Sequence, residues 1–139
     1  MFNLNHVGIV VPSLSDAVPL FCQLLAYPAE AVEYHDVPSE QVRVAMLKGN
    51  TTIELLEPTA ADSALARFLE KRGPGFHHWC FAAPAPLQAK LDELKQAELR
   101  LLDDTPRTGA EGVVFFVHPK SAGGILTEFV EQDEPHSGG

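Results

Sequence analysis

Several residue types are scarce in this chain of 139 residues, and each scarcity excludes a class of protein. Cys22 and Cys80 are its two cysteines, too few for a disulfide-stapled secreted domain. No apolar run approaches the roughly 20 residues of a membrane-spanning helix. Lys and Arg number 10 against 19 Asp and Glu, so the formal charge is −9, which argues against non-specific nucleic-acid binding. Neither nucleic acid nor membrane is therefore an expected partner.

The remaining composition, 45% hydrophobic and 21% charged, is that of an ordinary globular protein. At this length we expect one domain, 1–139, with a substantial core. The residues from Met1 to His6 carry neither the basic nor the long apolar region of a secretory signal. We therefore expect a cytoplasmic protein with reduced thiols, and a mobile tail over 132–139.

Apolar alternation and turn residues predict the strands, and helical spacing of apolar residues predicts three helices. The first helix is expected to run to about residue 26 with Leu20, Leu24 and Leu25 facing the core. Ser15 is favoured over Ser13 as its N-cap, because Pro19 then falls in the first turn. The other helices are expected over 62–72 and from Pro86 onward, the last with a core stripe of Leu87, Leu91 and Leu94. The expected strands are 4–11, 30–35, 42–47, 51–56, 76–83, 99–102, 113–117 and 125–130.

The two halves of the chain repeat one order of elements. Strand, helix and three further strands are expected over about 4–58, and again over about 75–131. A histidine opens the first strand of each half, and a proline follows it by six residues: His6 with Pro12, and His78 with Pro84. This repeat predicts an α+β fold made of two βαβββ modules in a pseudo-two-fold arrangement.

A glutamate lies inside a late apolar strand of each half, at Glu54 and Glu128, 48 residues after His6 and 50 after His78. A carboxylate in a buried strand is costly unless it is paired, hydrogen-bonded or bound to metal. If the modules pack as a pseudo-two-fold pair, two imidazoles and two carboxylates converge, a donor set that suits a divalent metal. The alternative is four structural or solvent-facing side chains, and the pattern alone leaves both interpretations open.

The alternation of side chains along a strand shows which neighbours of His78 share its face. His78 and Cys80 share one face of their strand, and His77 points to the other. We expect Cys80 to line a pocket rather than to bind metal, and His118, which begins a loop, to have a structural role.

Five segments that span the chain from near residue 4 to 131 carry a resemblance to a known family. The chain resembles the methylmalonyl-CoA epimerases of the vicinal oxygen chelate (glyoxalase-like) superfamily. The matching segments are Asn5–Val11 (NHVGIVV), Thr52–Pro58 (TIELLEP), Gly75–His78 (GFHH), Pro106–Gly112 (PRTGAEG) and His118–Gly124 (HPKSAGG).

The resemblance implies a half-barrel of two βαβββ modules around a divalent metal ion. Carried over residue by residue, it implies the metal ligands His6, Glu54, His78 and Glu128. It leaves the ion open among Co, Zn, Ni, Mn and Mg. It also implies a homodimer.

The resemblance further implies inversion of C2 of methylmalonyl-CoA by removal and return of the C2 proton. Glu128 is the first candidate base and Glu54 the second. Some members of the family carry a further glutamate on the strand that matches Arg43–Met46, where this sequence has none. Contacts to the acyl-CoA substrate are expected from Lys120, Ser121 and Arg107.

Three alternatives share the implied fold. A glyoxalase I-type lyase would act on a glutathione hemithioacetal through similar chemistry. An extradiol dioxygenase needs open positions on iron, which Glu54 would fill. A metal-free protein that sequesters a small molecule, as in antibiotic resistance, would not need all four candidate ligands. Metal analysis of the purified protein separates that alternative from the enzymes.

Overall fold

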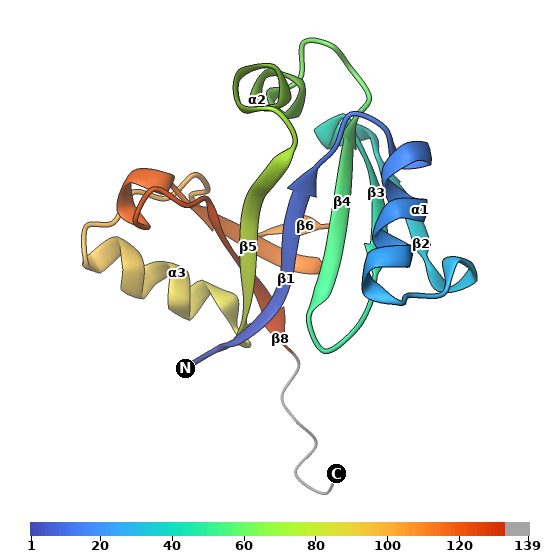
Figure 1. Ribbon diagram of the computed structural model, residues 1–139. Helices are drawn as coiled ribbons and strands as arrows, with labels where there is room; N and C mark the ends of the chain where they lie inside the picture. The colour runs from blue at the N-terminus through green and yellow to red at the C-terminus, as the bar shows by residue number, and fades with distance from the viewer. Residues whose placement is uncertain (133–139) are drawn as a thin grey trace, which may run out of the picture. The chain divides into compact units, whose positions relative to one another are not determined.

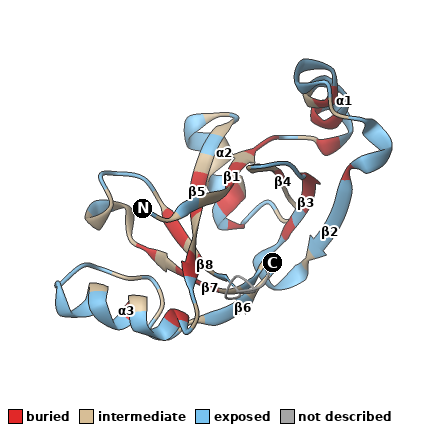
Figure 2. Ribbon diagram, turned by 90° about the horizontal axis from the view of Figure 1, so that it is seen from below, coloured by how far each residue is buried: buried red, intermediate tan, exposed pale blue. Residues whose placement is uncertain are grey.

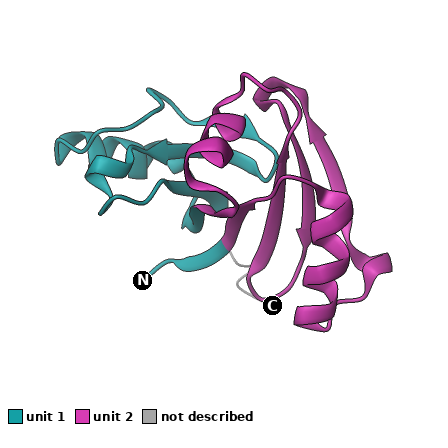
Figure 3. Ribbon diagram, turned by 45° about the horizontal axis from the view of Figure 1, so that its top comes forward, with its two compact units in different colours: residues 1–5, 78–139 teal, residues 6–77 magenta. Residues whose placement is uncertain are grey.

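The computed structural model describes residues 1–132, which form the eight strands and three α-helices shown in Figure 1. The chain divides into two compact units, coloured in Figure 3: unit 1 comprises residues 1–5 and 78–139, and unit 2 comprises residues 6–77. The tail that was expected to be mobile, 132–139, lies outside the described residues apart from Gln132.

Unit 2 contains a sheet in the order β2–β3–β4–β1, with β1 parallel to β4 and the other neighbours antiparallel. Residues 3–5 at the start of β1 belong to unit 1. The helix α1 lies along one face of this sheet (Figure 1), and α2 follows β4 in the chain. The elements are β1 (Asn3–Val10), α1 (Leu14–Leu25), β2 (Glu33–Val37), β3 (Val42–Leu47), β4 (Thr52–Pro58) and α2 (Ala64–Arg72).

Unit 1 repeats this arrangement with the strand order β6–β7–β8–β5 and with β5 parallel to β8. In both units the first strand pairs in parallel with the fourth, and a helix follows the first strand. The predicted pair of βαβββ modules and the α+β class are therefore confirmed. The elements are β5 (Gly75–Pro84), α3 (Leu87–Gln96), β6 (Arg107–Gly109), β7 (Gly112–Val117), the 3-10 turn η3 (Pro119–Ser121) and β8 (Thr127–Gln132).

The predicted core face of α1 is wrong. Leu20, Leu24 and Leu25 are all more than half exposed. The buried stripe begins one residue after the true N-cap, which is Ser13 and not Ser15, because the Ser13 hydroxyl accepts a hydrogen bond from the backbone N–H of Asp16. The residues that face the core are Leu14, Ala17, Val18 and Cys22.

The predicted strand over 99–102 is reduced to a single bridge between Leu101 and Val117. Asp103 ends the pairing, since its carboxylate rather than a backbone carbonyl accepts the N–H of Phe116 at 2.8 Å. The outer strand of unit 1 forms instead at β6, which begins eight residues later than the expected strand.

The core of unit 1 lies between α3 and one face of its sheet, with Leu87 and Leu91 packed against Phe115 and Val117. This confirms the predicted stripe of α3. In Figure 2 the buried positions follow the strands, while the helices keep long exposed stretches. Among the described residues, no helix is long and apolar enough to cross a membrane.

The packing predicts a large difference between two leucine truncations. Leu91 is fully buried and Leu24 is 67% exposed. Leu91→Ala should lower the free energy of unfolding by about 2–5 kcal/mol, because it removes buried methyl groups and leaves a cavity. Leu24→Ala should change it by less than about 0.5 kcal/mol. Urea unfolding followed by circular dichroism measures both, and equal losses would contradict the packing of α3.

Candidate functional site

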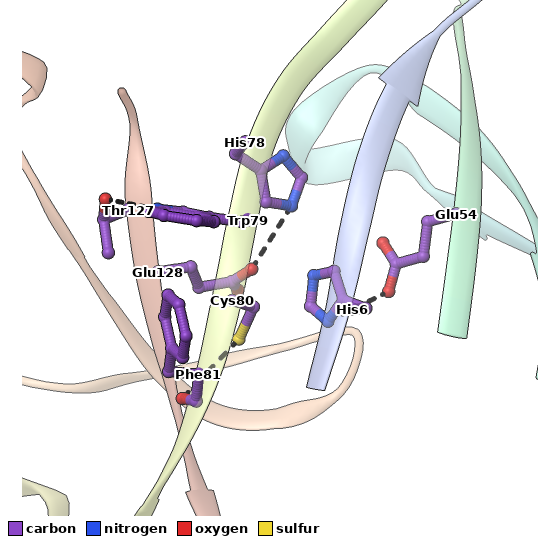
Figure 4. Close-up of polar contacts among 8 residues, drawn as sticks. All are labelled: His6, Glu54, His78, Trp79, Cys80, Phe81, Thr127 and Glu128. Atoms are coloured by element: carbon purple, nitrogen blue, oxygen red, sulfur yellow. Dashed lines mark hydrogen bonds and ion pairs between the residues drawn. The ribbon is translucent and has the colours of Figure 1, made fainter. Parts of the chain in front are cut away.

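In unit 2, the side chains of His6 and Glu54 form a buried pair. Nδ1 of His6 lies 3.5 Å from Oε2 of Glu54, and the two residues are 1% and 5% exposed (Figure 4). The strands place them there, because Glu54 on β4 lies directly opposite Gly8 on β1, two residues after His6. The imidazole therefore contacts a carboxylate that lies diagonally across the strand pair.

Unit 1 contains a matching pair of His78 and Glu128. Nε2 of His78 lies 3.3 Å from Oε1 of Glu128, and the residues are 9% and 7% exposed (Figure 4). Glu128 on β8 lies opposite Cys80 on β5, which is again two residues after the histidine. The sequence offsets of 48 residues from His6 to Glu54 and 50 from His78 to Glu128 therefore give the same strand register in both units.

The donor set of these pairs fits a divalent metal ion. Each pair offers an imidazole nitrogen and a carboxylate, the ligands that zinc, cobalt and similar ions take in proteins. All four side chains are buried, and burial of ionisable groups is costly without such a partner. Buried His and Glu donors of this kind can hold a metal ion.

The neighbouring histidine is directed elsewhere. His77 packs edge-on against Phe68 of α2, with their ring centroids 5.0 Å apart. Cys80 is fully buried, and its thiol lies 3.9 Å from the carbonyl of Phe81.

A chain of contacts in unit 1 connects Arg107 to the His78 pair. The ring of Phe116 lies edge-on to His78 at 5.9 Å, and the Arg107 guanidinium lies over the same ring at 5.4 Å. Asp103 holds this arrangement, because its carboxylate accepts from Nε of Arg107 at 2.9 Å and from the N–H of Phe116. Sequence reasoning missed Asp103, since only the fold shows that it contacts Phe116.

The other two candidate substrate residues, Lys120 and Ser121, lie on the turn η3. The Ser121 hydroxyl accepts the N–H of Arg100 at 2.9 Å. Nδ1 of His118 accepts the N–H of Lys120 at 3.0 Å and so caps the turn, which confirms the structural role predicted for His118.

The cap makes this turn sensitive to pH. The surrounding protein and the charges of Arg100 and Lys120 lower the pKa of His118 below its ordinary value of 6.5. A lowered pKa means that the folded chain binds fewer protons there than the unfolded chain. This contribution to stability is therefore full above pH 6.5 and is lost as the pH falls through the lowered pKa.

An NMR titration of the His118 ring should give a midpoint below 6.5, and Lys120→Gln should raise it because one nearby positive charge is gone. A His118 midpoint at or above 6.5 would contradict the cap.

The comparisons with known proteins agree with this geometry. Residues 5–117 match the family described as Glyoxalase/Bleomycin resistance protein/Dioxygenase superfamily. The chain is 41% identical over 129 residues to the ethylmalonyl-CoA/methylmalonyl-CoA epimerase of Cereibacter sphaeroides, which covers 90% of this chain and 94% of that protein. It is 38% identical over 128 residues to the human mitochondrial methylmalonyl-CoA epimerase, covering 90% of this chain and 71% of the human one.

The chain belongs to the methylmalonyl-CoA epimerase family. A solved structure of a variant of the Streptomyces coelicolor methylmalonyl-CoA epimerase, in complex with 2-nitronate-propionyl-CoA, supports this with a TM-score of 0.86 and 33% identity. The match covers 95% of this chain and 98% of that one. The vicinal oxygen chelate fold predicted from the sequence is thereby confirmed.

The strand β3 carries no carboxylate, and Val44 and Met46 on it are buried. The one charged residue of β3, Arg43, is exposed and pairs with Asp36 at 3.6 Å. Glu54 is therefore the buried carboxylate of unit 2.

Proposed function

We propose that this chain is a metal-dependent epimerase that inverts C2 of methylmalonyl-CoA. The observation that carries the proposal is the buried His–Glu pair that each unit repeats in one register. Membership of the methylmalonyl-CoA epimerase family supplies the substrate.

The residues that would hold the ion are His6, Glu54, His78 and Glu128. When bound, a divalent ion supplies positive charge that stabilises the negative charge developing on the substrate oxygens as the C2 proton leaves. The choice among Co, Zn, Ni, Mn and Mg is left to metal analysis, since nitrogen and carboxylate donors accept all five to different degrees.

Inversion needs a proton acceptor on one face of C2 and a donor on the other. Glu128 takes the proton in this proposal, because it is the buried carboxylate of unit 1 beside His78. Glu54 returns a proton to the opposite face, since β3 offers no carboxylate to do so. At the start Glu128 is ionised and Glu54 is protonated. The proton of the C–H bond that breaks passes to Glu128, the new C–H bond takes the proton of Glu54, and exchange of both groups with water restores the starting state.

Arg107 recognises the free carboxylate of the malonyl group. Asp103 and the Phe116 ring orient its guanidinium toward the face that carries His78. Lys120 and the Ser121 hydroxyl, on η3, are proposed to contact the phosphates of CoA, where the net charge of −9 makes a local basic group necessary.

Arg107→Ala should raise KM for methylmalonyl-CoA about ten-fold or more, since a hydrogen bond to a charged group contributes about 1.5–3 kcal/mol. The effect on kcat should be smaller, because the carboxylate contact exists before the proton moves. Arg43→Ala is the matched control, an exposed arginine on β3. Equal KM and kcat values for the two variants would show that Arg107 does not contact the substrate.

A homodimer and a cytoplasmic location complete the proposal. We propose the dimer from the resemblance to the family alone, and light scattering tests it, since the monomer mass is 15.1 kDa. The human relative is a mitochondrial protein, so fractionation of the source cells must test the location.

A substrate panel tests the proposal against the other enzymes of this fold. Metal-loaded protein is incubated in D2O with methylmalonyl-CoA, with propionyl-CoA and with the hemithioacetal of methylglyoxal and glutathione. Mass spectrometry then follows deuterium uptake and product. We expect rapid uptake with methylmalonyl-CoA alone. Conversion of the hemithioacetal with no uptake by methylmalonyl-CoA would identify a lyase instead.

A further inference from the structure

A second pair of glutamates repeats between the units, on the opposite side of the same strands. Glu57 follows Glu54 by three residues on β4, and Glu131 follows Glu128 by three on β8. Because side chains alternate along a strand, residues three apart face opposite sides. Glu57 and Glu131 therefore point to the helix-covered face, away from the histidine that their neighbours contact.

Each of these carboxylates accepts a hydrogen bond from the first residue of a helix. The N–H of Leu14 in α1 donates to Oε2 of Glu57 at 2.8 Å, and the N–H of Leu87 in α3 donates to Oε2 of Glu131 at 2.9 Å. The first N–H groups of a helix lack partners within it, and its N-terminus carries partial positive charge. A carboxylate meets both requirements, so each bond ties a strand to the helix that covers it.

The two units differ in how far they depend on this bond. The helix α1 has a second cap in Ser13, whose hydroxyl accepts the N–H of Asp16. The N-cap residue of α3 is Pro86, which offers no side-chain hydrogen bond. The attachment of β8 to α3 therefore relies more heavily on Glu131 than the attachment of β4 to α1 relies on Glu57.

The two residues between Glu128 and Glu131 connect the bond at Glu131 to the position of Glu128. Phe129 packs into the core with Leu87 of α3, and Val130 packs beside Cys80 on the opposite face. With Glu131 bonded to the helix, residues 129–131 are held at their far end and on both faces of the sheet.

We propose that Glu131, and more weakly Glu57, are positioning residues for the metal and proton-transfer carboxylates. By tying the strand to a helix N-terminus, each holds the glutamate three residues earlier against its histidine. The inference rests on the proposed function in taking Glu128 and Glu54 as ligands. The sequence signal is the Glu-x-x-Glu spacing that occurs in both late strands.

Cobalt binding to the full-length protein tests this inference without relying on turnover. The single tryptophan of the chain, Trp79, directly follows His78, so its fluorescence should be quenched as cobalt(II) binds. Glu131→Ala should weaken cobalt affinity about ten-fold, the lower end of the cost of disturbing the surroundings of a metal ligand, because Glu128 is then less firmly held against His78. Glu57→Ala should weaken it less, because Ser13 still caps α1.

Two variants separate positioning from charge and from stability. Glu70→Ala removes the same charge from an exposed position of α2 and should leave the affinity within two-fold of the parent. Glu131→Gln keeps an acceptor oxygen for Leu87 and should recover most of the loss. All titrations are run well below the melting temperature of each variant, where a merely structural role would leave the affinity of the folded protein unchanged.

Cobalt affinities of Glu131→Ala and Glu57→Ala within two-fold of the parent would overturn the inference. If Glu131→Ala does not fold, Glu57→Ala and Glu131→Gln decide it. A parent that binds no cobalt would overturn the metal site and this inference together. A parent that binds cobalt but exchanges no C2 proton would refute the epimerase alone, and the comparison of variants would still decide the positioning role.

Discussion

Replacing Glu128 by Gln should reduce C2 proton exchange of methylmalonyl-CoA by at least about 100-fold, because a general base contributes about 10²–10⁴-fold. Glutamine has nearly the same shape but cannot accept the proton. It keeps an oxygen beside Nε2 of His78, where the parent distance is 3.3 Å. The measurement is the initial rate of deuterium uptake under saturating substrate.

Two controls make this result interpretable. Glu70→Gln removes a charge from the exposed side of α2 and should exchange like the parent. Circular dichroism and thermal unfolding of Glu128→Gln should show the parent fold. Exchange at the parental rate in folded Glu128→Gln would exclude this residue as the base.

The second large effect is expected from the two adjacent histidines. His78→Ala should weaken cobalt affinity by at least about 100-fold, more than the loss of an outer partner of a metal ligand costs. His77→Ala should leave the affinity within a few-fold, because His77 packs on Phe68. The two variants change the same residue type at neighbouring positions of β5.

Isothermal titration with cobalt(II) and zinc(II) measures both affinities. The opposite ranking, with His77→Ala losing the metal, would reverse the strand parity on which the site is built. Equal affinities for both variants would show that His78 is not a ligand.

The repeat was predictable because its signals are local. Alternating apolar residues and a proline six residues after each histidine were enough to place both modules. The same pattern predicts a shared role for His6, Glu54, His78 and Glu128, since buried carboxylates in matched strands need partners, while the pairing of each histidine with one glutamate comes from the structure. Their roles as metal ligands and bases stay predictions.

The features that sequence reasoning missed depend on distant contacts. The carboxylates of Glu57 and Glu131 cap helices 43 and 44 residues away, and no local pattern shows that the strand ends lie there. Asp103 likewise replaces a strand partner of Phe116. Pro19 favours a later helix start at Ser15 over Ser13, yet a proline within the helix is tolerated here.

Proton NMR of methylmalonyl-CoA in D2O, with metal-loaded protein, tests the central claim most directly. The controls are substrate alone and protein treated with EDTA. The account predicts fast loss of the C2 proton signal with the loaded protein, suppressed by EDTA and restored by added cobalt. Loss no faster than in the controls would contradict the epimerase and direct attention to hemithioacetals and to small-molecule binding.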